Sequence, residues 1–280
     1  MLDAVGIAVT PMNQHLSHRA VLSFTGADRT SFLQGLITND VQSLAPATSV
    51  WSALLTPQGR WLSEFFLYDA SDRILMDCAA EHADMLVKRL SRFRLRADVQ
   101  IEKTDLRVIT GAESGHVPPD TITHAPDPRC DGAGWRAIVT GTGQGGETPE
   151  EFLARRLTLG LPDVMDFESE QTLALEADMD LLNGVSWKKG CYMGQELTAR
   201  THYRGLVKRR LLPVVLPDGM FPGEGGIIIA GDREVGDIRS RSGNRALAML
   251  RRDAWSSTEL TCNGQPLSVV WLAWFPPEMR

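Results

Sequence analysis

Cysteine is scarce in this sequence and widely spaced. Four cysteines occur among the 280 residues, each more than fifty residues from the next: Cys78, Cys130, Cys191 and Cys262. No CxxC pair exists, which argues against a zinc ribbon and against a thioredoxin-type redox pair. A disulfide framework is not expected in a cytosolic chain of this length. The histidines His15 and His18 have no third ligand nearby in the sequence, so we predict no metal site.

Long apolar runs are also missing. The best apolar stretches, residues 226–230 and 269–275, are far shorter than the ~20 residues of a transmembrane helix and are typical of strands. No basic segment followed by an apolar one is found at the N-terminus, so no secretory signal is predicted. Asp3 comes early and arginine is scarce before Arg19, which is unlike a transit peptide. We therefore expect a cytoplasmic protein with no membrane partner.

Positive charge is in deficit, with 29 Lys and Arg against 35 Asp and Glu, which argues against a general polyanion-binding protein. The balance reverses locally, because residues 188–210 contain seven basic residues and one acid, and residues 88–96 form a second basic run. Such runs are either solvated surfaces or sites for a carboxylate tail, a phosphate or RNA. RNA-reading modules interleave basic residues with exposed aromatics. Here only three aromatics accompany the first run: Trp187, Tyr192 and Tyr203.

The chain has the composition of a globular protein, with 43% hydrophobic and 23% charged residues. Strand and helix patterns alternate over the first 110 residues without regular βαβ spacing, which favours an α+β fold. Residues 49–55 and 61–68 predict a hairpin around the turn at 56–60. A helix is predicted at 81–94, with four side chains facing inward: Met85, Leu86, Leu90 and Phe93.

Residues 111–148 are rich in Gly, Pro, Asp and Thr, and we expect a loop-rich excursion with one strand at 135–139. Thr148 and Glu151 fit a capping box, so a helix should begin at Pro149. Beyond residue 206, short strands at 211–216, 226–230, 246–250 and 267–274 alternate with turn signals, which predicts a small barrel or sandwich. We place the domain boundary near Gly205, giving a body at 1–205 and a barrel at 206–280.

Residues 187–200 (WKKGCYMGQELTAR) form the segment richest in chemical groups. Glycines on both sides of the CYM tripeptide permit positive φ and a close backbone approach to a ligand. The lysines at 188 and 189 would stabilise a thiolate at Cys191 and make it reactive. The alternative is that Cys191 is a small buried residue at a turn that leads into a helix from Gln195.

Residues 189–196 (KGCYMGQE) resemble the signature of the YgfZ family of folate-binding proteins, which are relatives of the glycine-cleavage aminomethyltransferase. Residues 25–41, 56–60 and 204–209 resemble further blocks of that family. The continuation at 196–202 is especially similar to the mitochondrial and alphaproteobacterial members that act in iron–sulfur cluster assembly.

This resemblance implies an aminomethyltransferase-like, folate-binding α+β body of two intertwined subdomains followed by a C-terminal β-barrel. It also implies tetrahydrofolate or a one-carbon derivative as ligand. Residues 173–179 resemble the stretch whose glutamate holds the pterin, which assigns that role to Glu176. A carboxylate can accept two parallel N–H bonds from a pterin edge. The resemblance further implies that motif residues shape the binding surface around Cys191: Lys189, Tyr192, Gln195, Glu196 and Arg200.

One departure from the aminomethyltransferase pattern concerns its paired aspartates, which this sequence replaces with Ser63 and Glu64. Serine cannot act as a general acid near neutral pH. Adjacent strand residues point to opposite faces, so Glu64 should face away from the first position. A simple aminomethyltransferase activity is therefore not the leading hypothesis.

We expect instead a tetrahydrofolate-binding accessory protein that supports assembly or repair of iron–sulfur enzymes, including those that modify tRNA, with Cys191 as the functional thiol. Transient cluster contact, disulfide exchange and a covalent adduct all remain open for this thiol. A cluster normally has four thiolate ligands, so any cluster would be shared with an assembly protein or client enzyme. The alternatives are a folate-dependent one-carbon transferase, with Glu64 or Glu196 as its acid–base group, and an RNA-binding module.

Overall fold

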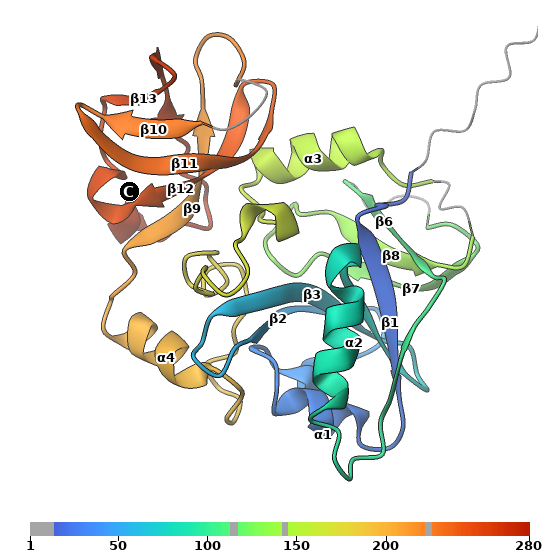
Figure 1. Cartoon of the computed structure of the whole chain (residues 1–280). Helices are drawn as coiled ribbons and strands as arrows, with labels where there is room; N and C mark the ends of the chain where they lie inside the picture. Colours follow the sequence, from blue (N-terminus) through green and yellow to red (C-terminus); the bar gives the residue numbers. More distant parts are fainter. Residues whose placement is uncertain (1–13, 113–116, 142–144, 222–225) are drawn as a thin grey trace, which may run out of the picture.

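Three sheets and four α-helices organise the residues that this computed structural model describes, which are 14–112, 117–141, 145–221 and 226–280 (Figure 1). The first sheet has the strand order β2-β3-β4-β1-β5, and every neighbouring pair is antiparallel. Its strands are β1 (Arg19–Thr25), β2 (Ser49–Leu55), β3 (Trp61–Asp69), β4 (Ile74–Ala79) and β5 (Gln100–Lys103). The predicted hairpin is confirmed, since β2 pairs directly with β3.

Two short helices, α1 (Arg29–Gln34) and α2 (Ala83–Ser91), cover one face of this sheet. Leu86 and Leu90 of α2 are fully buried there, as predicted. Met85 is half-buried and packs against the same cluster, whereas Phe93 is 40% exposed because α2 ends at Ser91, so the prediction of an inward side chain was wrong for Phe93 alone.

The second sheet has the order β6-β8-β7, formed by β6 (Arg107–Gly111), β7 (Thr121–Pro126) and β8 (Trp135–Val139). The excursion at 111–148 was predicted to contain only the strand at 135–139, and β7 corrects this. Most of β7 is exposed or half-buried and it ends in a proline, so it has no run of apolar residues to reveal it. The capping box is confirmed: Thr148 accepts from Glu151 N at 3.2 Å, and α3 (Pro149–Thr158) begins there.

The seven-stranded third sheet has the order β14-β13-β10-β11-β12-β9-β15. Its longest strand, β11, was not predicted, because Gly236 and Asp237 separate Val235 from Ile238 and a bulge follows. The strand predicted at 267–274 is limited to two paired residues. The strands are β9 (Arg209–Val215), β10 (Ile227–Ala230), β11 (Arg233–Ser242), β12 (Arg245–Arg251), β13 (Leu260–Cys262), β14 (Gln265–Pro266) and β15 (Ser268–Val269).

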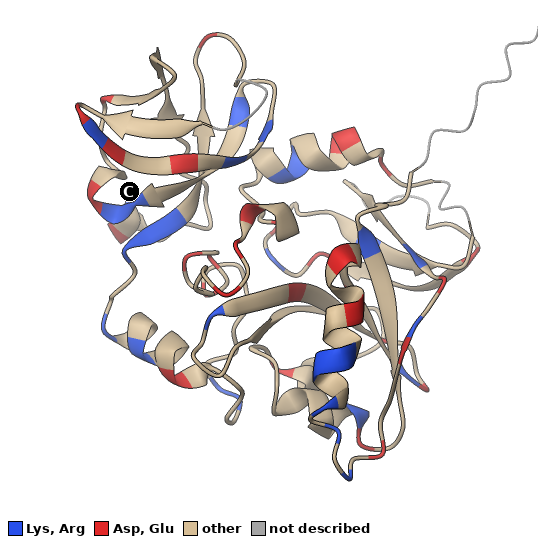
Figure 2. Ribbon diagram, viewed as in Figure 1, with Lys and Arg blue, Asp and Glu red and all other residues tan. Residues whose placement is uncertain are grey.

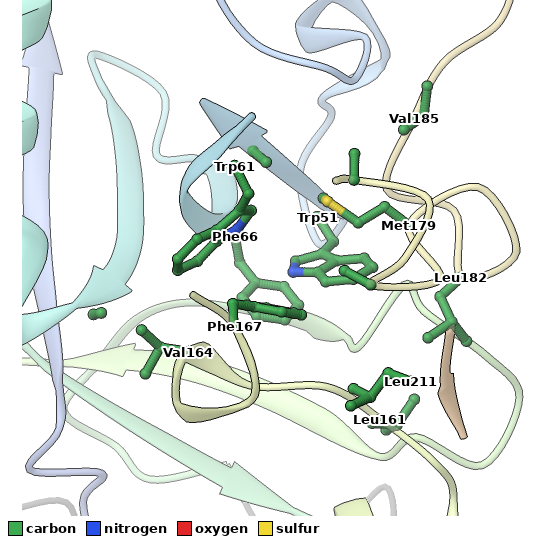
Figure 3. Packing of buried hydrophobic residues seen from close by; sticks show 14 of the residues in the cluster. Trp51, Trp61, Phe66, Leu161, Val164, Phe167, Met179, Leu182, Val185 and Leu211 are labelled. Carbon is green, nitrogen blue, oxygen red and sulfur yellow. The ribbon is translucent and has the colours of Figure 1, made fainter. Parts of the chain in front are cut away.

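The three sheets meet around one apolar cluster (Figure 3). Trp51 and Phe66 enter it from the first sheet, Leu211 enters from β9, and Phe167 and Met179 come from the turn-rich segment at 167–194. Helix α3 packs on β11 and β12, where Arg156 bonds to Ser240 Oγ at 2.6 Å. The remaining helices are α4 (Gln195–Tyr203), η1 (Val41–Ser43), η2 (Ala80–His82), η3 (Val164–Asp166), η4 (Arg252–Ala254) and η5 (Pro277–Met279).

In the described residues, no helix has the length and apolar character needed to cross a bilayer. The boundary predicted near Gly205 falls in the segment between α4 and β9.

Candidate functional site

The KGCYMGQE loop packs on the tip of the β2–β3 hairpin, so two motifs more than 120 residues apart in the sequence meet in space. Gly194, the N-cap of α4, has φ +81°, and a Cβ there would lie 2.6 Å from Thr56 O. At the hairpin tip, Gly59 has φ +78°, and a Cβ there would lie 2.8 Å from the Leu197 Cβ. Glycine is thus required at both contact points. Gly190 has open space around it and no positive φ, so a special backbone conformation is seen on only one side of Cys191.

Lys189 anchors this loop to the segment that follows α1. Its Nζ donates to Ile37 O and to Asn39 O, both at 2.8 Å, and lies 5.3 Å from the centre of the Tyr192 ring. Burial lowers the pKa of this amine to about 8. The Lys189 ammonium therefore fixes the loop to residues 37–39 by donating hydrogen bonds to their backbone carbonyls.

Cys191 is the exposed thiol of the chain. All four cysteines lie in described residues: Cys78 and Cys262 are buried, and Cys130 is half-buried. Burial raises the pKa of Cys78 to about 12, which leaves that thiol inert near neutral pH. The alternative of Cys191 as a small buried residue is therefore wrong. Among the described residues, no group of three or more His, Cys, Asp and Glu side chains gathers to hold a metal, so Cys191 would supply one ligand only.

The other motif residues lie around the start of α4. Tyr192 is buried, and burial raises the pKa of its hydroxyl to about 12. Gln195 is half-buried at the first position of the helix, while Glu196 and Arg200 are exposed and one turn apart. The structure thus brings Lys189, Cys191 and these four residues into one loop and one helix face.

Glu176 lies apart from that group, beside the segment that joins α4 to β9. Its Oε1 accepts from Arg209 Nε at 2.9 Å, and its Oε2 accepts from Leu173 N at 2.9 Å. The side chain borders an open cavity of about 730 Å³ with a largely basic wall. None of the other predicted ligand-binding residues lines this cavity. Figure 2 shows positive residues in α4 and at the start of β9.

Ser63 and Glu64 point to opposite faces of the first sheet, as predicted. The Ser63 hydroxyl lies 3.2 Å from His82 Nδ1, on the side covered by α2. Glu64 is 2% exposed, is ion-paired with Arg19, and accepts from Trp51 Nε1 at 2.9 Å. These contacts hold Glu64 as a buried, paired carboxylate.

Sequence reasoning missed the buried pairs around Arg210. This guanidinium bonds to Asp178 Oδ1 at 2.9 Å and to both oxygens of Asp180 at 2.8 Å. Burial raises the pKa of Asp178 to about 8, and its Oδ2 has no partner among the described residues. Trp187 and His202 also stack, with ring centres 3.9 Å apart. The partners lie fifteen to thirty-two residues apart, so the only signal in the sequence was the basic run itself.

The sheets and helices form an aminomethyltransferase-like fold with a C-terminal β-barrel, which confirms the predicted α+β class. The crystal structure of the glycine cleavage system aminomethyltransferase T from Bartonella henselae is similar over 93% of this chain and 85% of that chain. The TM-score is 0.75 and the sequence identity is 15%, so the similarity concerns the fold. Residues 208–277 match the family described as the CAF17 C-terminal beta-barrel domain.

Sequence similarity to characterised proteins identifies the family within this fold class. An iron–sulfur cluster assembly factor IBA57 homolog of Coccidioides immitis is 31% identical over 88% of this chain and 72% of its own length. The human iron–sulfur cluster assembly factor IBA57 is 32% identical over 84% of this chain and 76% of its own length. A homolog from Mycosarcoma maydis is 33% identical over 70% of this chain, which spans only 55% of that protein. The chain belongs to the IBA57 family of iron–sulfur cluster assembly factors.

These relatives correct one prediction. The proteins from Coccidioides immitis, Mycosarcoma maydis and human all carry the word mitochondrial in their names, so the prediction of a cytoplasmic protein is wrong. An import signal is recognised by the composition of a short segment. The few residues before Arg19 were therefore a weak basis for predicting the location.

Proposed function

We propose that this chain acts as an accessory factor in the assembly or repair of iron–sulfur cluster proteins, with Cys191 as its functional thiol. The single observation that carries the proposal is the exposed thiol on a loop whose backbone is fixed by Lys189 and Gly194. A fixed loop holds the sulfur in one place while leaving it accessible to a partner. The names of the relatives support the same role.

The cluster is cargo in this proposal. Four thiolates usually hold a cluster, and Cys191 contributes one, so the remaining ligands come from an assembly protein or a client enzyme. The partner's cysteines would approach the exposed side of the loop, where Lys188, Cys191 and Glu196 are accessible to solvent. We include in this proposal that the chain is a member of the wider YgfZ family and that its client enzymes include some that modify tRNA.

A complementation experiment tests the thiol. In cells depleted of their own IBA57 relative, we expect Cys191→Ala to fold but to leave iron–sulfur enzyme activities low. Cys130→Ala is the matched control, because Cys130 is half-buried, and this variant should restore those activities. Full rescue by Cys191→Ala, at the same protein level as the wild type, would rule out a role for the thiol.

We also propose tetrahydrofolate or a one-carbon derivative as a ligand of the cavity bordered by Glu176. The cavity of about 730 Å³ lies within the range of sites for molecules of this size. Its basic wall suits the glutamate end of a folate, and a pterin edge would take the place of Arg209 at the Glu176 carboxylate. A bound tetrahydrofolate would supply one-carbon chemistry. The chain's own part would be to orient the pterin through Glu176.

Anaerobic calorimetric titration with tetrahydrofolate tests this second proposal. The wild type should show saturable binding that Glu176→Ala loses, while Glu150→Ala, an exposed acid on α3, should bind like the wild type. Absence of binding to the wild type would exclude the folate proposal and leave the thiol proposal standing. A one-carbon transferase with Glu64 as its acid–base group is disfavoured, because Glu64 is buried and both of its oxygens are engaged by Arg19 and Trp51.

A further inference from the structure

The cavity beside Glu176 has an unbalanced charge. Four basic side chains line it, Lys208, Arg209, Arg251 and Arg252, against two acids, Glu176 and Asp253. Glu176 is paired with Arg209, and Asp253 is shared by Arg251 at 3.3 Å and Arg233 at 2.8 Å. Over the described part of the chain, Lys208 and Arg252 have no carboxylate partner. Two cations in this cavity are therefore left without a counter-charge.

Backbone contacts hold these two cations on neighbouring segments. Arg252 N donates to Lys208 O at 2.8 Å, and Arg252 Nη1 donates to Gly205 O at 3.0 Å. The Arg252 guanidinium also lies 6.0 Å from the centre of the Trp255 ring. Both side chains are exposed where they line the cavity. A ligand with negative charge would supply the missing counter-charge.

We propose that this cavity is a binding site for an elongated oligoanion, with its negative groups on Lys208 and Arg252. Two cations without a counter-charge line this space of about 730 Å³, so the ligand that matches them carries at least two anionic groups along a chain. Leu206 and Val207 add apolar surface to the wall of the cavity. The proposal depends on the cavity and its charges, and it holds whether or not a pterin binds at Glu176.

Two sources share this chemistry: an oligo-γ-glutamyl tail, which carries a row of carboxylates, and an oligophosphate, such as that of a nucleotide. Basic side chains bind both through charge-assisted hydrogen bonds, and arginine does so in a planar fork. The anionic groups, rather than the rest of the ligand, therefore determine recognition at Lys208 and Arg252.

Calorimetric titration of the full chain at low salt tests the inference with tripolyphosphate, penta-γ-glutamate and orthophosphate as probes. The wild type should bind at least one of the first two in a saturable manner and bind orthophosphate more weakly. The variant Lys208→Glu/Arg252→Glu should weaken that binding by about tenfold or more, as expected when charge-assisted hydrogen bonds are lost. Preference for one probe identifies the source of the anion.

A matched control is the variant Lys88→Glu/Arg92→Glu, which makes the same charge change on exposed positions of α2 and its C-cap. It should bind the probes like the wild type. The inference is overturned if the wild type binds neither oligoanion, or if both variants lose binding equally, since that result indicates attraction to net charge alone. Lys208→Ala, which leaves the Arg252 contacts intact, keeps the test valid if the double variant does not fold.

The outcome is separable from that of the folate proposal. Oligoanion binding without tetrahydrofolate binding supports the cavity and excludes the pterin role of Glu176. Tetrahydrofolate binding by a wild type that binds neither oligoanion supports Glu176 and overturns the oligoanion site.

Discussion

The two basic runs of this chain have similar composition and different surroundings. In the run at 88–96, Lys88, Arg92, Arg94 and Arg96 are exposed on α2 and the turn that follows it. In the run at 188–210, Lys189 and Arg210 are held inside by carbonyls and carboxylates, and further basic residues border a cavity. A run of positive charge thus forms a solvated surface in one region, while in the other region its side chains hold buried segments together. Only the neighbours supplied by the fold distinguish the two.

The largest difference between the runs should appear on removal of a buried cation. Arg210→Met leaves Asp180 without its bidentate partner and should cost about 3–5 kcal/mol of unfolding free energy. Arg92→Met, in the exposed run, should change stability by no more than about 0.5 kcal/mol. Denaturant unfolding of both variants measures the contrast. Equal effects at the two positions would remove the distinction between the runs.

A smaller effect separates the two glycines that flank the exposed cysteine. Gly194→Ala should cost about 1–3 kcal/mol, because its φ is +81° and the new Cβ would meet Thr56 O. Gly190→Ala has open space and no positive φ, and it should be close to neutral. Thermal unfolding checks both variants, and alkylation of Cys191 reports whether the loop has moved. A stable Gly194→Ala variant would show that the contact with the hairpin tip is not needed.

A further contrast is a pH dependence from the buried carboxyl group that faces Arg210. Burial raises the pKa of Asp178 from 3.8 to about 8, so between these values the native state binds more protons than the unfolded state. This group therefore lowers stability as the pH rises from 4 towards 8. Asp178→Asn should remove that decline, while Asp84→Asn, on the exposed run's helix, should retain it. Unfolding free energies measured across this pH range test the prediction. Parallel curves of unfolding free energy against pH for Asp178→Asn and wild type would contradict the raised pKa of Asp178.

Much of the local structure was predictable because its causes are local. The hairpin at 49–68 follows from two apolar runs around a turn, and α3 begins where Thr148 and Glu151 form a capping box. The missed strands β7 and β11 are the opposite case. Their side chains are largely exposed or charged, and they are held by pairing with β8 and with β10 and β12.

At the candidate site, the motif could be predicted from the residues alone: a cysteine between two glycines, beside lysines, ahead of a helix. The sequence also indicated the fold class and the family resemblance to iron–sulfur assembly members. The packing of distant segments was needed to show that Lys189 donates to backbone carbonyls, that Cys191 is exposed and that Glu176 is paired with Arg209. The physical reason is that a side chain's charge, exposure and partners depend on segments far away in the chain. A motif fixes which groups are present, and packing fixes which of them remain free to act.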